Sequence, residues 1–128
     1  MASILQVCAV DFTARRFLLP LMRAQREAGF DVHLACAPGA DTPRITAEGF
    51  PVYPVPFRRS MNVLAHARAY LRLARLLRVH TFTIVHAHTP IAALIARFAA
   101  RRAGVPLVLY TAHGFYFHEA MRPAVRNA

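Results

Sequence analysis

Residues 84–111, with the sequence IVHAHTPIAALIARFAARRAGVPLVLYT, decide the fold of this chain. A short apolar run at Ile84–Ala87 precedes a segment of helical period at Pro90–Ala103, and a second apolar run follows at Leu107–Thr111. An apolar run, a helical segment and another apolar run in this order are typical of a parallel βαβ unit. The stretch therefore predicts two parallel strands joined by a crossover helix.

The residues at the helix ends support this interpretation. Thr89 can cap the helix, and Pro90 occupies its first turn, where a missing N–H costs nothing. Gly104 follows the helix, and Gly29 and Gly49 stand at equivalent places between a helical segment and an apolar run. Glycine suits the position after a helix because it adopts the left-handed backbone without a Cβ penalty.

The same alternation extends back to the beginning of the chain. Further strands are predicted at Ile4–Val10, Val32–Ala37 and Val52–Val55, and further helices at Ala14–Ala28, Pro43–Glu48 and Val63–Val79. We therefore expect a Rossmann-like, doubly wound parallel sheet between two helical layers, with strand order 3-2-1-4-5.

Length and composition limit what the chain can be. Its 128 residues suffice for one domain, 1–128, and hydrophobic residues at 56% exclude a disordered chain. No apolar stretch reaches the roughly 18 residues of a spanning helix, and the first residues lack a signal peptide's positive charge. Cys8 and Cys36 lie in apolar runs, as reduced core thiols do, so we expect a cytoplasmic protein.

The formal net charge of +10 comes entirely from arginine and indicates anionic partners such as phosphate, nucleic acid or an acidic lipid surface. In the first helix, Phe17, Leu21, Ala24 and Ala28 are predicted to face inward and Arg15, Arg16, Arg23 and Arg26 outward. In the third helix, Val63, Tyr70, Leu73, Ala74 and Leu77 are predicted to face inward and Arg68, Arg72 and Arg75 outward. Two neighbouring elements would then present arginine stripes, either as solvated faces or as a membrane contact. Nucleic acid is the less favoured partner, because no recognition helix or arginine-aromatic interleaving is present.

Polar residues follow the strands that flank the expected reversal of winding, where ligands bind in such sheets. The first strand ends in Asp11-Phe12-Thr13, the fourth in His86-Ala87-His88-Thr89-Pro90, and the fifth in Thr111-Ala112-His113-Gly114-Phe115. The helix start after His88-Thr89 would offer free N–H groups to a phosphate or a sugar hydroxyl, and His113 could donate to a sugar oxygen or carry a proton.

Each of these candidate residues also has a purely structural interpretation. His86 and His88 are better interpreted as a packed pair at a strand end than as metal ligands, because no acidic residue or cysteine completes a ligand set. Asp11 either caps the first helix or contacts ligand. By geometry alone, His113 is as compatible with a structural role as with a functional one.

Three segments closely resemble the N-terminal domain of family 4 glycosyltransferases, especially the bacterial enzymes of capsular and exopolysaccharide synthesis. The segments are Val85-His86-Ala87-His88-Thr89-Pro90, Ala99-Ala100-Arg101-Arg102-Ala103-Gly104-Val105-Pro106 and Tyr110-Thr111-Ala112-His113-Gly114-Phe115-Tyr116-Phe117-His118. The resemblance implies the GT-B fold, in which an acceptor-side domain faces a nucleotide-sugar domain. It also implies metal-independent retaining transfer without a cofactor, a nucleotide-sugar donor, and frequently a lipid-linked acceptor at the inner face of the cytoplasmic membrane. By this resemblance His113 is the catalytic-site histidine, which contacts the donor sugar near the reacting carbon.

The chain departs from that family in two ways. The Gly-Gly turn that many members have after the first strand is replaced by Asp11-Phe12-Thr13-Ala14, which puts that contact with the donor diphosphate in doubt. The residues that would form the nucleotide-binding domain do not follow His118, so we expect an incomplete acceptor-side domain. The alternative is a non-enzymatic binding module, either one subunit of a split transferase or a basic domain for anionic polymers. An adjacent reading frame encoding a donor domain would favour the transferase.

Overall fold

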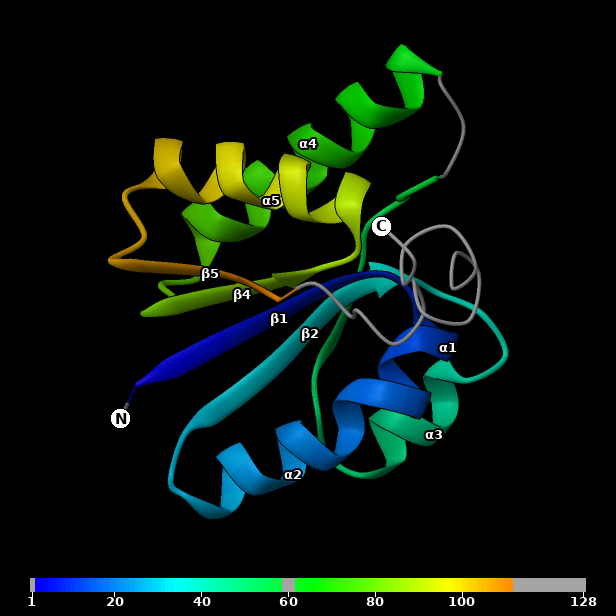
Figure 1. Ribbon diagram of the computed structural model, residues 1–128, viewed down its shortest axis with the longest axis vertical. Coiled ribbons are helices and arrows are strands. Elements are labelled where there is room, and N and C mark those ends of the chain that lie inside the picture. Colours follow the sequence, from blue (N-terminus) through cyan, green and yellow to red (C-terminus); the bar gives the residue numbers. More distant parts are fainter. Residues whose placement is uncertain (1, 59–61, 112–128) are drawn as a thin grey trace, which may run out of the picture.

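The computed structural model describes residues 2–58 and 62–111, and in this part of the chain it confirms the predicted sheet. Five strands pair in the order β3-β2-β1-β4-β5, and every pairing is parallel. The strands are β1 (Ser3–Val10), β2 (Asp31–Ala37), β3 (Val52–Pro54), β4 (Ile84–His88) and β5 (Leu107–Thr111). Figure 1 shows them running in one direction, so their carboxyl ends share one edge of the sheet.

Helices cover both faces of the sheet (Figure 1). One layer contains α1 (Asp11–Thr13), the π-helical turn η1 (Ala14–Leu18), α2 (Leu19–Glu27) and α3 (Thr42–Ala47). The other contains α4 (Val63–Val79) and α5 (Pro90–Ala103), whose bounds match the predicted ranges. Gly29, Gly49 and Gly104 have the positive φ angles predicted for them, 99°, 95° and 76°.

Alternation along the strands separates the core into two clusters. Leu5 and Val7 of β1 face the layer of α4 and α5, and Cys8 of the same strand faces α2 and α3. The buried face of α5 consists mostly of alanines, namely Ala92, Ala93, Ala96, Ala99 and Ala100. Such small side chains allow the α5 backbone to lie close to the sheet, which fixes where this helix begins relative to the strand ends.

The predicted inward face of the first helix is wrong. Leu21 is 37% exposed, whereas Leu18 and Met22 are 1% and 0% exposed. Residues 17–22 are nearly all apolar, so the helical period alone permits more than one inward face. The helix also begins three residues early, at Asp11, and the η1 turn lets both Leu18 and Leu19 reach the core.

The prediction of two neighbouring arginine stripes is also wrong, because α2 and α4 lie on opposite faces of the sheet (Figure 1). Three of the four arginines of the first helix, namely Arg15, Arg23 and Arg26, contact residues 41–50 instead. Arg15 Nε lies 2.7 Å from Asp41 Oδ1, and Arg23 donates to both carboxylate oxygens of Glu48 at 2.7 and 2.6 Å. Arg23 lowers the pKa of Glu48 by this hydrogen bonding. Much of this stripe is therefore neutralised by nearby carboxylates.

In α4 the prediction holds for the arginines, since Arg68, Arg72 and Arg75 are exposed. Leu73 and Leu77 are buried as predicted, but Val63 is 78% exposed. Val63 is the first residue of α4, and it precedes the turn in which Ala65 meets the core. The outward face of α4 is thus basic and free of described acidic neighbours.

The corrected face of α2 can be tested with a matched pair of substitutions. Met22→Ala should destabilise the chain by about 2–5 kcal/mol, because it leaves a cavity in the core. Leu21→Ala should cost under about 1 kcal/mol, since this side chain already contacts solvent. Urea denaturation of both variants measures the difference, and a larger loss for Leu21→Ala would restore the face expected from the sequence.

Candidate functional site

The candidate site lies where the direction of winding reverses. Strand β1 pairs with β2 on one side and β4 on the other, with Val7 opposite both Ala35 and Ala87. After β1 the chain enters the α1 layer, and after β4 it enters α5 on the opposite face (Figure 1). Connections that diverge in this way leave a crevice beyond the strand ends. At this edge Phe12 is 50% exposed and Thr13 is half-buried.

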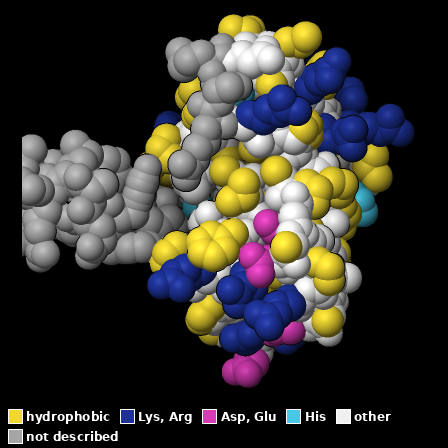
Figure 2. Space-filling view, turned by 90° about the vertical axis from the view of Figure 1, so that its right-hand side faces the viewer, with side chains coloured by type: hydrophobic (Ala, Val, Ile, Leu, Met, Phe, Trp, Pro, Cys, Tyr) yellow, Lys and Arg dark blue, Asp and Glu magenta, His cyan; other side chains and the backbone are white. Residues whose placement is uncertain are grey.

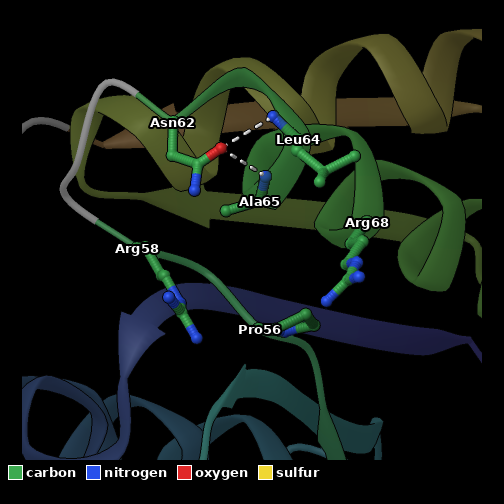
Figure 3. Close-up of a pocket in the computed structure, with 6 residues that line it drawn as sticks. All are labelled: Pro56, Arg58, Asn62, Leu64, Ala65 and Arg68. Atoms are coloured by element: carbon green, nitrogen blue, oxygen red, sulfur yellow. Dashed lines mark hydrogen bonds between the residues drawn. The ribbon is translucent and has the colours of Figure 1, made fainter.

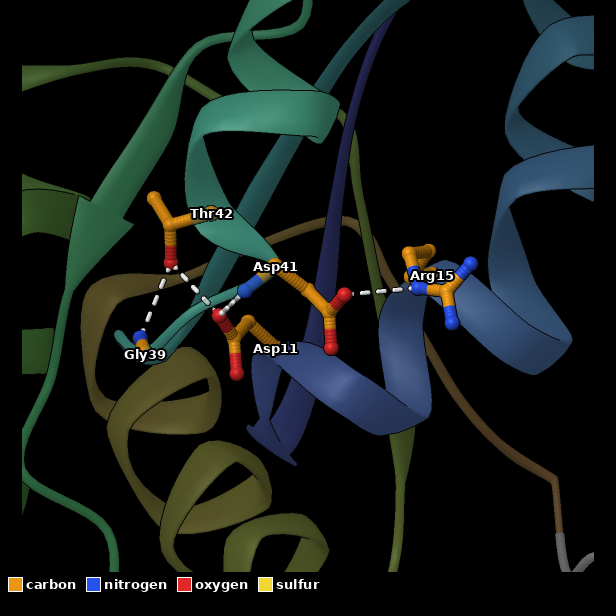
Figure 4. A network of polar contacts seen from close by, with 5 residues as sticks. All are labelled: Asp11, Arg15, Gly39, Asp41 and Thr42. Atoms are coloured by element: carbon orange, nitrogen blue, oxygen red, sulfur yellow. Dashed lines mark hydrogen bonds and ion pairs between the residues drawn. The ribbon is translucent and has the colours of Figure 1, made fainter.

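Asp11 joins two of the loops at this edge. Its side chain does not cap the first helix, and the residue is 5% exposed. Oδ2 of Asp11 accepts hydrogen bonds from the Asp41 backbone N–H and from Thr42 Oγ1, both at 2.9 Å (Figure 4). Thr42 Oγ1 in turn accepts from the Gly39 N–H at 3.0 Å. The Asp11 carboxylate therefore holds the β2–α3 loop against the end of β1.

Thr89 begins α5 in an unusual backbone conformation. Its φ of 66° and ψ of 137° lie outside the regions that β-branched residues favour. Its side chain does not cap the helix as predicted, because Oγ1 donates to the carbonyl of His88. Pro90 stands at the first turn as expected, and the Ala93 N–H bonds to the Thr89 carbonyl at 2.8 Å. Strained backbone of this kind concentrates at functional sites.

A chain of polar side chains crosses the sheet beneath this edge. Gln6 is buried and donates to Gln25 Oε1 at 3.0 Å, while its own Oε1 lies 2.7 Å from His88 Nε2. Because the Gln6 oxygen can only accept, His88 Nε2 is the donor. The rings of His86 and His88 lie 4.1 Å apart, and His86 Nε2 is 2.6 Å from Thr111 Oγ1. The two histidines are thus a packed, hydrogen-bonded pair.

Sequence reasoning did not identify the role of Gln6. The usable signal in the sequence was a lone amide inside an apolar strand, and the structure pairs this residue with His86. A buried polar group requires a partner, and the partner here comes from β4, far away in the chain. The network fixes the orientation of the His88 side chain on the α2 face of the sheet, two residues before α5 begins.

The structure describes only some of the remaining predicted site residues. Thr111 ends β5 beside His88, so the chain leaves this strand at the same edge. His113, Gly114 and Phe115 lie outside the described residues, and their assignment stays a prediction. Ligand contacts by Asp11, Phe12, Thr13, His88 and Thr89 also stay predictions.

The two cysteines lie away from this edge, in the buried cluster under α2. Hydrogen bonding to Cys36, together with burial, raises the pKa of the Cys8 thiol. A protonated, buried thiol is a poor nucleophile, so the chemistry of the site does not use it.

Charge is distributed unevenly over the molecule. From Gly49 to His118 the sequence has nine arginines and no acidic residue. Figure 2, which faces the carboxyl edge of the sheet, shows acidic side chains only in the lower half of this face and arginines without acidic neighbours above. Among the described helices, none is long and apolar enough to cross a membrane. The α4 side of the edge therefore carries the positive potential.

The sheet order, the two helical layers and the reversal of winding between β1 and β4 define this protein as a Rossmann-like domain of the kind found in GT-B enzymes. The family described as "Glycosyl transferase 4-like domain" matches residues 13–128, and the chain belongs to this family. It corresponds to the N-terminal half of the GT-B architecture.

Two relatives agree with this assignment. The chain is 34% identical over 118 residues to the putative glycosyltransferase EpsD of Bacillus subtilis, covering 90% of this chain and 30% of that protein. It is 31% identical over 98 residues to a UDP-Gal:alpha-D-GlcNAc-diphosphoundecaprenol alpha-1,3-galactosyltransferase of Escherichia coli, covering 76% of this chain and 25% of that enzyme. The chain therefore spans less than a third of either relative.

Solved structures share the fold at low sequence identity. MurG of Acinetobacter baumannii aligns with a TM-score of 0.66 and 17% identity, over 86% of this chain and 35% of MurG. A UDP-N-acetylglucosamine 2-epimerase aligns with a TM-score of 0.68 and 15% identity, over 86% of this chain and 33% of the epimerase. These likenesses support the architecture alone.

The loop-holding role of Asp11 can be tested through its contact with Gly39. A Cβ added to Gly39 would lie 2.8 Å from Asp11 Oδ1, closer than atoms in van der Waals contact. Gly39→Ala should therefore destabilise the chain by about 1–3 kcal/mol. In an Asp11→Ala background, which itself costs two hydrogen bonds, the same substitution should cost much less. Additive losses in thermal unfolding of the four proteins would contradict the contact.

Proposed function

We propose that the chain is the acceptor-side part of a glycosyltransferase that moves a sugar from a nucleotide-sugar donor to a lipid-linked saccharide in polysaccharide synthesis. The observation that carries the proposal is the family match over residues 13–128. The name of the Escherichia coli relative describes a galactosyl donor and an acceptor bearing a diphosphate on a polyprenol. A saccharide linked by diphosphate to a polyprenol is accordingly the acceptor class proposed here.

The proposed residue roles combine the family motif with the geometry of the edge. His113 acts at the reacting sugar, and the adjoining Gly114 and Phe115 contact substrate. From the neighbouring strands Asp11, Phe12, Thr13, His88 and Thr89 contribute to the same crevice. The support from the described residues is that β1, β4 and β5 end at one edge, with His88 opposite Thr111.

We further propose that the nucleotide-sugar half comes from another polypeptide segment or subunit. The support is the 30% and 25% of each relative that this chain covers. In the GT-B architecture the donor lies in the other half, so these 128 residues by themselves should not transfer sugar.

The basic face of α4 supports a proposed contact with an anionic membrane surface. Leu64 and Leu71 are 64% and 65% exposed on the same side of the helix as Arg68 and Arg75. Exposed leucines between arginines suit an interfacial helix, whose apolar side chains enter the headgroup region while the cations meet anionic lipid.

The activity prediction requires an assembly in which a matching donor half is supplied. Such an assembly should transfer sugar to a lipid-linked acceptor, and the chain alone should not. In the assembly, His113→Asn should lower turnover by about 100-fold or more, the scale of a lost proton donor or transition-state contact. Its melting temperature should remain almost unchanged.

His88→Asn is the matched control. Because His88 is buried and bonded to Gln6, this substitution should lower the melting temperature and change turnover per folded molecule less than His113→Asn does. A destabilised but fully active His113→Asn protein would remove His113 from the site. Robust transfer by the chain alone would contradict the need for a second half.

The membrane prediction is tested by sedimentation with liposomes. The chain should bind vesicles containing anionic lipid and be released by salt, since the screening length falls to about 3 Å at 1 M. Replacing Arg68, Arg72 and Arg75 with Gln should weaken this binding without unfolding the chain. Equal binding to neutral vesicles would exclude the electrostatic contact.

A further inference from the structure

A small pocket opens between the segment that leaves β3 and the first turns of α4. Its volume is about 80 Å³, several times the roughly 10–15 Å³ of probe volume that one water needs. The residues that line it are Pro56, Arg58, Asn62, Leu64, Ala65 and Arg68. The pocket is thus large enough for a small polar group and carries two permanent positive charges.

The two guanidinium groups approach this space from opposite sides. Figure 3 shows the side chains of Arg58 and Arg68 on either side of this space, both extending toward the level of Pro56, one from the β3–α4 segment and the other from the second turn of α4. Within the described part of the chain neither arginine takes part in an ion pair. Two positive charges that line one pocket without a described counter-charge form a site that an anion would stabilise.

The helix adds to this charge without being its main source. Asn62 Oδ1 accepts from the N–H groups of Leu64 and Ala65 at 3.0 and 3.3 Å, so these donors are already occupied. The positive end of the macrodipole of this 17-residue helix still points at the pocket. The two arginine side chains are therefore the main source of positive charge in the pocket.

We infer that this pocket binds a phosphoryl group, held between Arg58 and Arg68. Guanidinium forks match phosphate oxygens in pairs, and two forks facing each other can bind oxygens on both sides of one group. Figure 1 shows α4 beginning at the side of the molecule where the strands end, so the pocket shares the edge of the candidate site. The pocket would then bind the diphosphate of a lipid-linked acceptor, an assignment that rests on the proposed function.

Titration with inorganic pyrophosphate at low salt tests the pocket directly, using calorimetry on the full chain. Arg58→Gln and Arg68→Gln should each weaken binding about tenfold or more, because each removes charged hydrogen bonds to the phosphoryl oxygens. The control is the double variant Arg101→Gln, Arg102→Gln, which removes two charges elsewhere and should change affinity less than about twofold. Absent binding, or equal losses in the control, would overturn the site.

Vesicle experiments separate the sources of the phosphoryl group. Neutral vesicles should gain affinity for the chain when undecaprenyl diphosphate is added, and Arg58→Gln should abolish this gain. The same variant should retain binding to phosphatidylglycerol vesicles, since Arg58 lies outside the basic face of α4. Loss of phosphatidylglycerol binding alone would assign the arginine to membrane headgroups and overturn the acceptor assignment.

Failure of the pocket and failure of the proposed function have different signatures. If a reconstituted assembly transfers no sugar while pyrophosphate binding depends on Arg58 and Arg68, the pocket stands and the transferase proposal falls. If transfer is restored but both variants keep the wild-type KM for acceptor and the wild-type pyrophosphate affinity, the pocket falls and the transferase proposal stands.

Discussion

Parallel pairing of β1 with both β2 and β4 is the constraint on which the rest of the structure depends. Since β1 is the central strand, its two faces are both buried, and its side chains alternate between the two core clusters. The chain must leave β1 toward one helical layer and β4 toward the other. The crevice at their carboxyl ends follows from this divergence and needs no special residue to create it.

Once the crevice exists, buried polar contacts determine its walls. The Asp11 carboxylate positions the β2–α3 loop by accepting from Asp41 and Thr42. Gln6 orients the His88 side chain on the α2 face of the sheet, at the carboxyl end of β4. A buried polar group without a hydrogen-bond partner would destabilise the fold. The partners and positions of Asp11 and Gln6 are therefore strongly specified.

The two helical layers also differ in their net charge. The helices of residues 11–47 carry arginines that pair with Asp41 and Glu48, so this layer is partly neutralised within itself. The layer of α4 and α5 belongs to a stretch without acidic residues, from Gly49 to His118. Its arginines therefore remain available to an external anion, and both the proposed membrane contact and the phosphoryl pocket use this excess. Arginine content alone did not distinguish the two layers.

The sequence by itself determined the bounds of α4 and α5 and the positive-φ glycines, because these depend on local period and local backbone preference. It also predicted the strand order, because a chain of alternating strands and helices follows the connection rules of doubly wound parallel sheets. It also placed Asp11 directly after β1 and His88 at the end of β4. Only the tertiary structure decided which face of α2 is buried, since consecutive apolar residues satisfy several helical faces and packing against the sheet selects one. The partners of Asp11 and His88, and the pocket that Arg58 and Arg68 both line, likewise arose only on folding. Each joins different structural elements, and no local pattern encodes which ones will meet.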